Sequence, residues 1–180
     1  MAKKRQSKGL IQVYTDGAYN WETGTGGYGA VIFMRKGGMN KMRKYASTIS
    51  YVDTTNNRME IRGILAAIKR IDSGYDIDIY TDSEYCEKIV KKLRKNFRDL
   101  PKANKDLWKL VADQLMKHWN GGSYINISWI RGHSGNTFNE MADRLADTGS
   151  KRVNKVVCDQ KYHEKKAIRE LSKKRKTNRR

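Results

Sequence analysis

The sequence predicts an α/β fold, with a mixed five-stranded sheet that begins with three antiparallel strands and has helices on both faces. Two observations predict it. Short segments with period-two alternation or a brief apolar run are typical of strands, and longer segments with apolar residues three and four positions apart are typical of helices. In order, the chain gives three strands, a helix, a strand, two helices, a strand and a helix, which suggests helices packed on a mixed sheet.

The first part of the chain predicts an antiparallel meander. Strands are expected over residues 10–15, 29–35 and 39–48. Asp16-Gly17 is a turn signal at the end of the first strand, and Gly37-Gly38 is typical of a hairpin turn between the second and third. Glycines that cluster over 24–29 lie between two strands and do not open a helix, so they do not predict a dinucleotide-binding loop.

The spacing of apolar residues changes at residue 54 from the alternation typical of strands to the spacing typical of a helix. An amphipathic helix is expected over 54–71, with Thr55 or Asn56 as its cap. The remaining elements follow as a strand over 77–80, a helix over 83–95, a helix over 103–119, a strand over 124–130 and a helix over 138–148. The helix over 103–119 is expected to bury Leu107, Leu110, Val111, Leu115 and Met116.

Charge divides the chain into three parts. The 180 residues carry 38 Lys+Arg and 19 Asp+Glu, a formal net charge of +19. Residues 1–9 carry a net +4 and residues 151–180 a net +10, so the centre is nearly balanced. We therefore expect a basic arm over 1–9, one domain over 10–150 and a basic tail over 151–180, partly helical or disordered, in which Val153, Val156, Val157, Ile168 and Leu171 could form a weak helical stripe. The excess predicts a polyanionic partner, namely nucleic acid, bound without sequence preference by the tail.

Cysteine usage and hydropathy narrow the class of protein. Cys86 and Cys158 make neither a disulfide framework nor a zinc-ligand spacing, and Cys86 is expected to pack inside a helix. No run of 18 apolar residues predicts a membrane span, and no apolar segment follows the basic N-terminus as in a signal peptide. We expect a cytoplasmic protein in a bacterial or phage-infected cell, with a nuclear or organellar location left open by the basic run 173–176.

Four acids lie at points where they could meet. Asp16 and Asp82 each follow a predicted strand, Glu60 lies near the start of a helix and Asp143 lies in the last helix. The strands before Asp16 and Asp82 are expected to be neighbours, because the fourth strand returns to the meander through a helix. Clustered carboxylates suit hard cations such as Mg²⁺ and Mn²⁺, and two such ions can drive phosphodiester cleavage. Taken singly, each acid is an ordinary turn, cap or surface residue, so the prediction depends on their joint occurrence.

Four motifs resemble those of type 1 ribonucleases H, in the order of that family. They are YTDGA over 14–18 with GGYGA over 26–30, TTNNRME over 54–60, YTDS over 80–83, and WIRGHSG over 129–135 with NEMADRLA over 139–146. The resemblance covers roughly residues 9 to 150. It implies a ribonuclease H-like fold and an endonuclease that hydrolyses the RNA strand of RNA/DNA hybrids with two Mg²⁺ ions, leaving 3′-hydroxyl and 5′-phosphate ends.

The resemblance also assigns roles. Asp16, Glu60, Asp82 and Asp143 match the metal-binding carboxylates, and His133 matches a mobile loop histidine that helps to move protons or release product. Imidazole suits proton transfer near neutral pH. The residues implied in substrate binding are Gly17, Thr55, Asn56, Asn57, Asn104, Trp108 and Asn139. Of these, Thr55 and Asn104 match a pocket for a DNA-strand phosphate, and Trp108 is either a lining of the DNA-strand channel or part of the helix core.

Some positions depart from the family pattern. Asp53 stands where the family often has an arginine that binds the DNA phosphate, and Glu22 stands where it often has an asparagine. The segment between Asp82 and Trp108 is shorter than in members with a long basic protrusion. It still carries seven cations, at Lys91, Lys92, Arg94, Lys95, Arg98, Lys102 and Lys105.

Other classes remain as alternatives: a hybrid-binding module without catalysis, a resolvase or transposase core, or a domain of a reverse transcriptase. The complete acid set and His133 argue against the first, and the motif over 54–60 argues against the second. We expect a standalone, monomeric enzyme.

Overall fold

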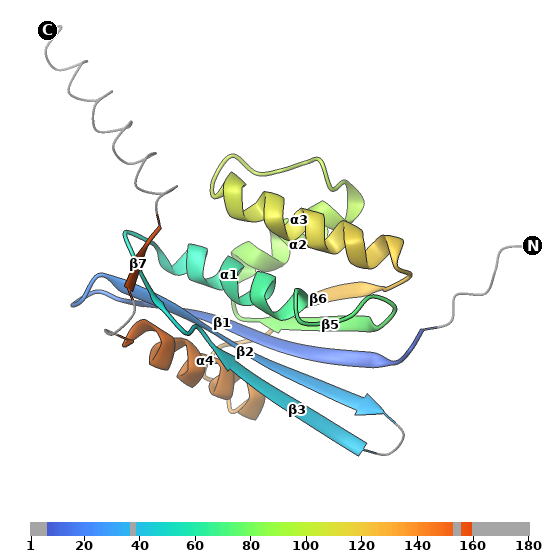
Figure 1. Ribbon diagram of the computed structural model, residues 1–180, viewed down its shortest axis with the longest axis horizontal. Coiled ribbons are helices and arrows are strands. Elements are labelled where there is room, and N and C mark those ends of the chain that lie inside the picture. The colour runs from blue at the N-terminus through green and yellow to red at the C-terminus, as the bar shows by residue number, and fades with distance from the viewer. Residues whose placement is uncertain (1–6, 37–38, 153–155, 160–180) are drawn as a thin grey trace, which may run out of the picture.

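The computed structural model describes residues 7–36, 39–152 and 156–159 (Figure 1). Within them lie seven strands and four helices, in the order β1 Leu10–Asn20, β2 Thr25–Lys36, β3 Met39–Ala46, β4 Ser50–Val52, α1 Asn56–Ile68, β5 Asp76–Thr81, α2 Glu84–Lys95, α3 Lys105–Asn120, β6 Ile125–Trp129, α4 Thr137–Ser150 and β7 Val156–Cys158. Every helix and strand predicted between residues 10 and 148 is present. No helix of these residues is long and apolar enough to cross a bilayer.

The strands form one mixed sheet in the order β6-β5-β1-β2-β4-β7, with β3 also paired to β2. β1 lies between β2, which is antiparallel to it, and β5, which is parallel. β4 pairs with the first residues of β2 and β3 with its later residues, so both follow the same edge of β2. The expected count of five strands is wrong, because β4 and β7 have three residues each and are too short to show an alternating pattern.

Helices cover both faces of the sheet, as predicted. α1, α2 and α3 lie on one face and α4 lies on the other (Figure 1). The larger core is on the three-helix side, and the smaller core on the α4 side is built on Tyr14, Val31 and Ala142, with the rings of Tyr14 and Tyr80 stacked 4.8 Å apart. Leu110 and Met116, expected inside, are 42% and 43% exposed, because α3 buries a narrower face that includes Leu107, Val111 and Leu115.

The sheet continues beyond the domain boundary expected at residue 150. β7 pairs in parallel with β4, with Tyr51 opposite Val157. Val156 and Val157 therefore lie in a strand, and the helical stripe predicted for them is wrong. Ser50, at the start of β4, donates to the carbonyls of Gly149 at 2.8 Å and Arg152 at 2.9 Å, which fixes the end of α4 where the chain turns toward β7.

Several further expectations, most of them for the two ends of the chain, concern residues outside the described ranges. They concern most of the N-terminal arm, the Gly37-Gly38 turn, Val153, Ile168, Leu171 and the basic run 173–180.

Candidate active site

β1 and β5 bring two of the predicted acids to one level of the sheet. The last residues that the two parallel strands pair are Thr15 and Thr81, so Asp16 and Asp82 follow side by side. The predicted neighbourhood of the two strands is confirmed. The turn expected at Asp16-Gly17 is wrong, because β1 stays paired with β2 as far as Asn20. Asp16 lies inside a strand rather than at its end.

Two glycines bring helices from both faces against this part of β1. A Cβ on Gly17 would collide with the main chain of Met59 and Glu60 in α1. Gly29, the partner of Asp16 on β2, would collide in the same way with the carbonyl oxygen of Ala142 in α4. Glycine is thus required for close packing here. α1 delivers Glu60 to Asp16 from one face, and α4 carries Asp143 toward it from the other.

Asp16, Glu60 and Asp82 form a compact carboxylate cluster. One oxygen from each lies within 4.8 Å of the others. Asp16 and Glu60 are buried, at 7% and 4% exposure, and Asp82 is half-buried. Asp143 lies at the rim with its side chain 38% exposed, and its Oδ2 atom is 3.8 Å from Nδ1 of His133.

Among the described residues, no lysine or arginine forms an ion pair with this cluster. Burial, and then the charges of Asp82 and Asp143, raise the pKa of Asp16 to about 7. Burial and the neighbouring Asp16 raise the pKa of Glu60 well above its ordinary value. The main-chain N–H of Gly17 donates to Asp16 Oδ1 at 2.7 Å, but the buried Oε2 atom of Glu60 has no hydrogen-bond partner among the described residues. Crowded carboxylate oxygens, one of them without a hydrogen-bond partner among the described residues, fit a hard divalent cation such as Mg²⁺.

Two residues expected to bind substrate lie in the interior beside this cluster. Gly17 is buried against α1. Asn139 is 2% exposed, and its Nδ2 atom donates to Asp82 Oδ2 at 3.4 Å. Both residues therefore position carboxylates of the cluster in this structure.

The start of α1 presents three of the predicted substrate residues. Thr55 caps the helix and accepts from the N–H of Arg58. Asn56 and Asn57 are exposed in the first turn, and the Nδ2 atom of Asn56 lies 3.4 Å from Glu60 Oε1. The exposed amide of Asn56 thus adjoins the carboxylate cluster directly.

Trp108 does not reach the surface. It is fully buried, and its indole N–H donates to the hydroxyl of Tyr85 at 2.9 Å. Of the two interpretations of Trp108, the helix core is the correct one, because a ring with no exposed surface cannot line a channel. Asn104 precedes α3 in the left-handed region at φ 52°, and its Oδ1 atom accepts from Arg58 at 3.4 Å.

A second group of buried charges was not predicted. Arg58, within the motif over 54–60, is 2% exposed and is held by two carboxylates. Its Nη2 atom donates to Asp106 at 2.9 Å and its Nε atom to Asp159 at 2.6 Å. Asp159 directly follows β7 and is also 3.5 Å from Arg62. No local pattern indicates this contact, because Arg58 and Asp159 are 101 positions apart.

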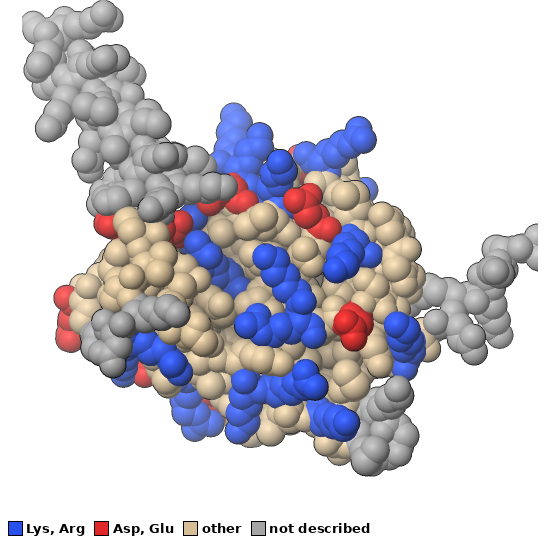
Figure 2. All heavy atoms as spheres, in the orientation of Figure 1, with Lys and Arg blue, Asp and Glu red and all other residues tan. Residues whose placement is uncertain are grey.

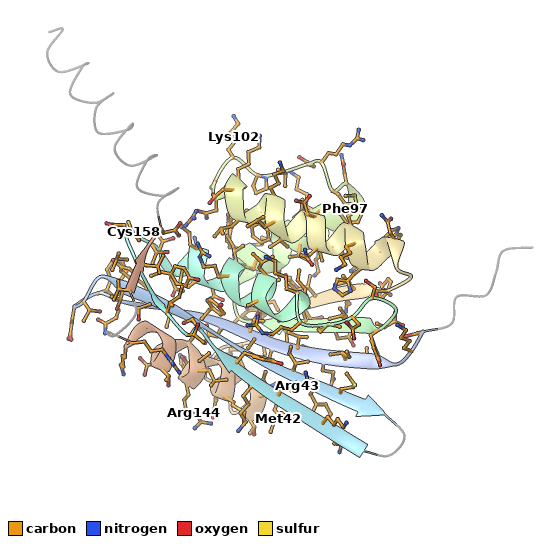
Figure 3. All side chains as sticks on the ribbon, in the orientation of Figure 1. Met42, Arg43, Phe97, Lys102, Arg144 and Cys158 are labelled. Carbon is orange, nitrogen blue, oxygen red and sulfur yellow. The ribbon has the colours of Figure 1, made fainter. Side chains whose placement is uncertain are left out.

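Of the two departures from the family pattern, Asp53 lies near this group. Asp53 has a left-handed φ of 53°, and the thiol of Cys158 donates to its Oδ2 atom at 3.7 Å. Figure 3 places Cys158 beside the N-terminal end of α1. Glu22 is exposed in the hairpin between β1 and β2. Cys86 is buried in α2, as predicted, and both cysteines are free thiols.

Positive charge also gathers on the body of the domain. Figure 2 shows Lys and Arg side chains gathered on the face over α1 and β3, where few acidic atoms are visible. Most of the cations between Asp82 and Trp108 are exposed, and Figure 3 shows Lys102 projecting away from the body in the loop that joins α2 to α3. A reduced basic protrusion is therefore present.

Comparison with known proteins agrees with this geometry. The family model for RNase H matches residues 8–151. The chain belongs to the ribonuclease H family. It is 34% identical over 154 residues to a ribonuclease H of Orientia tsutsugamushi, a match that covers 81% of this chain and 85% of that protein. It is 35% identical over 151 residues to a ribonuclease H of Hahella chejuensis, with 79% and 95% covered.

A solved structure has the same fold. It is the crystal structure of LC9-RNase H1, described as a type 1 RNase H with the type 2 active-site motif, at a TM-score of 0.58 and 25% identity over 78% of this chain and 72% of that one. The predicted family, fold class and ribonuclease H activity are thus confirmed.

Proposed function

We propose that this ribonuclease H cuts the RNA strand of RNA/DNA hybrids with two Mg²⁺ ions held by Asp16, Glu60, Asp82 and Asp143, with Mn²⁺ able to replace Mg²⁺. The observation that carries the proposal is the cluster of three carboxylates, two of them buried, whose like charges help to raise the pKa of Asp16 to about 7. Bound divalent cations would activate the attacking water and stabilise the leaving oxygen.

The residues of the chain supply position and proton transfer. Asp16 and Glu60 are held rigidly by packing of α1 on β1, which suits groups that must keep a fixed geometry through the reaction. His133 is 82% exposed on its loop and 3.8 Å from Asp143, a place from which an imidazole can exchange protons with both water and the site. His133 has a left-handed φ of 49° and lies between Gly132 and Gly135, and the φ of Gly135 is also positive, at 84°.

Substrate recognition is proposed for the exposed start of α1 and for Asn104. Asn56 and Asn57 offer amide donors and acceptors suited to 2′-hydroxyls and base edges in a minor groove. Thr55 and Asn104 are linked through Arg58, since Thr55 accepts from the N–H of Arg58 and Asn104 accepts from its guanidinium. We propose that these two residues form the phosphate pocket, with Asp53 lowering its affinity because an acid repels phosphate.

The decisive experiment compares labelled RNA/DNA hybrid with duplex RNA and duplex DNA, in Mg²⁺ and in EDTA. We expect cleavage of the RNA strand of the hybrid alone and only with metal. Asp16→Asn should lower the rate by at least about a thousandfold, because an amide keeps the shape but loses the charge that binds the cation. Circular dichroism checks that the variant is folded.

The outcomes separate the alternatives. Tight hybrid binding without cleavage at any metal concentration would indicate a binding module. Cleavage of duplex DNA would indicate a resolvase-like nuclease. Near-normal cleavage by Asp16→Asn would contradict the metal-site assignment while leaving the hybrid specificity intact.

A further inference from the structure

The loop between β6 and α4, residues 130–136, carries His133 and is fastened against Asp82 at both ends. Trp129 is the last residue of β6 and pairs with Thr81, the residue before Asp82. Asn139 lies in the first turns of α4 and contacts the Asp82 carboxylate. Residues at both ends of the loop that carries His133 thus contact Asp82 or the strand that precedes it.

Trp129 makes two bonds at the start of this loop. Its indole N–H donates to the main-chain carbonyl oxygen of Asp82 at 2.9 Å. Its main-chain N–H donates to Glu87 Oε1, also at 2.9 Å, and Glu87 is paired with Lys91 at 2.8 Å. The main chain of Trp129 is therefore bonded to α2 and its indole to the Asp82 turn, although 43% of the residue is exposed.

The middle of the loop closes on the carboxylate itself. A Cβ on Gly132 would lie 2.7 Å from Asp82 Oδ2, so a side chain there would have to displace the carboxylate. Beyond it, Asn136 caps α4 by accepting from the N–H groups of Phe138 and Asn139. The cap fixes the start of the helix from which the Asn139 amide reaches Asp82.

We infer that Trp129 is a positioning residue for Asp82, whose carbonyl its indole N–H holds so that the carboxylate faces Asp16 and Glu60. The inference rests on the proposed metal site and deepens it. Trp has a single polar group, and an indole that is nearly half exposed gains little from packing alone. The indole N–H of Trp129 donates to the main chain of Asp82, the residue whose carboxylate is a candidate metal ligand.

The test is Trp129→Phe, which keeps an aromatic ring and removes the donor. Trp119→Phe, at a 52% exposed tryptophan in the last turn of α3, is the matched control. Isothermal titration with Mn²⁺ on the substrate-free, full-length protein gives the metal affinity, and thermal melting reports stability. We expect Trp129→Phe to bind Mn²⁺ about tenfold more weakly than wild type, and its cleavage rate to recover as Mn²⁺ is raised. Trp119→Phe should leave the affinity unchanged.

A second variant decides the matter if Trp129→Phe does not fold. Gly132→Ala keeps the indole in place and puts a methyl group against Asp82 Oδ2. It should weaken Mn²⁺ binding to a similar extent. Wild-type Mn²⁺ affinity in folded Trp129→Phe would overturn the positioning role alone. Wild-type affinity in folded Gly132→Ala would show that the placement of the Asp82 carboxylate does not control metal binding, which removes the basis of that role as well. Equal Mn²⁺ binding by wild type and Asp16→Asn would overturn the metal site and this inference together.

Discussion

Two groups of buried charge lie on α1, two residues apart, and they are built in opposite ways. Arg58 meets carboxylates of opposite charge, from Asp106 at the start of α3 and Asp159 after β7. Glu60 meets carboxylates of its own sign, from Asp16 and Asp82. Residues two apart on a helix face different sides, so one helix supports both groups without mixing them.

The electrostatic consequences differ accordingly. Burial disfavours the charge of Arg58, but hydrogen bonds to Asp106 and Asp159 outweigh it and raise the pKa of the guanidinium. In the carboxylate cluster, burial and neighbouring charges act in the same direction, and both raise the pKa of Glu60. A paired group holds elements of the fold together, whereas an unpaired one costs stability until a cation binds. The contrast supports a structural role for Arg58 and a functional one for Glu60, although both belong to one motif.

The paired group should show the larger effect on stability. Asp159→Ala leaves Arg58 with the carboxylate of Asp106 but not that of Asp159, and should lower the free energy of unfolding by about 3 kcal/mol. Denaturation in urea measures the change. Asp147→Ala is the control, since its pair with Lys151 is exposed, and should cost less than about 1 kcal/mol. Equal losses in the two variants would show that the buried network does not hold β7 to α1.

The unpaired group should change stability in the opposite direction. In the metal-free protein the folded state retains a proton on Asp16 up to about pH 7, whereas the unfolded chain releases it near pH 4. Stability is therefore full below about pH 4 and is lost as pH rises through about 7. Asp16→Asn removes this loss, so it should melt several degrees above wild type at pH 8 in EDTA. A lower melting temperature for the variant would contradict the account of an uncompensated cluster.

Adding a divalent cation also tests whether the charge of the carboxylate cluster destabilises the metal-free protein. Mg²⁺ or Mn²⁺ should raise the melting temperature of wild type at pH 8 and have little effect on Asp16→Asn, because a ligand that binds only the folded state stabilises it. Asp147→Ala serves again as the control and should respond to metal as wild type does.

His133 should matter less than the carboxylates. His133→Ala should slow hybrid cleavage by roughly 10- to 100-fold, because water can partly replace a proton carrier, and it should leave the melting temperature unchanged since the side chain is 82% exposed. Single-turnover rates measured beside Asp16→Asn provide the comparison. A loss as large as that of Asp16→Asn would make His133 an indispensable catalytic group.

The smallest effect is expected beyond Asp159. Residues 160–180 carry ten basic and two acidic residues, and removing them should weaken hybrid binding. The salt dependence of binding should also become shallower, by about 0.9 in slope for each phosphate that these residues neutralise in the full chain. The maximal rate should stay within a few-fold. Binding measured from low to high salt gives the slope.

A comparison of two truncation points separates the role of β7 from that of residues 160–180. A chain ending at Ser150 also loses β7 and Asp159, and should be destabilised about as much as Asp159→Ala. If both truncations melt like wild type, β7 is not part of the stable fold. If the salt slope is unchanged after removal of 160–180, that segment does not contact nucleic acid.

The sequence by itself determined the helices, the longer strands, the family and the four candidate acids. These features are local: α1 shows the helical spacing of its apolar residues, and each acid stands in a short motif of fixed spacing. The element order was also enough to predict that the strands of Asp16 and Asp82 adjoin, which β1 and β5 confirm.

Only the tertiary structure decided which polar residues are buried in the site, which aromatic residues pack in the core, and which distant segments pair. Asp16-Gly17 has the sequence of a turn, but pairing with β2 keeps it within a strand, and the glycine is required by the backbone of α1. Trp108 could have lined a channel, and packing buries it completely. β7 has three residues and acquires its strand conformation from β4, about a hundred positions earlier, so no local pattern could predict it or the Asp159 contact that follows. Contacts between distant segments depend on how the helices pack on the sheet, which no window of sequence contains.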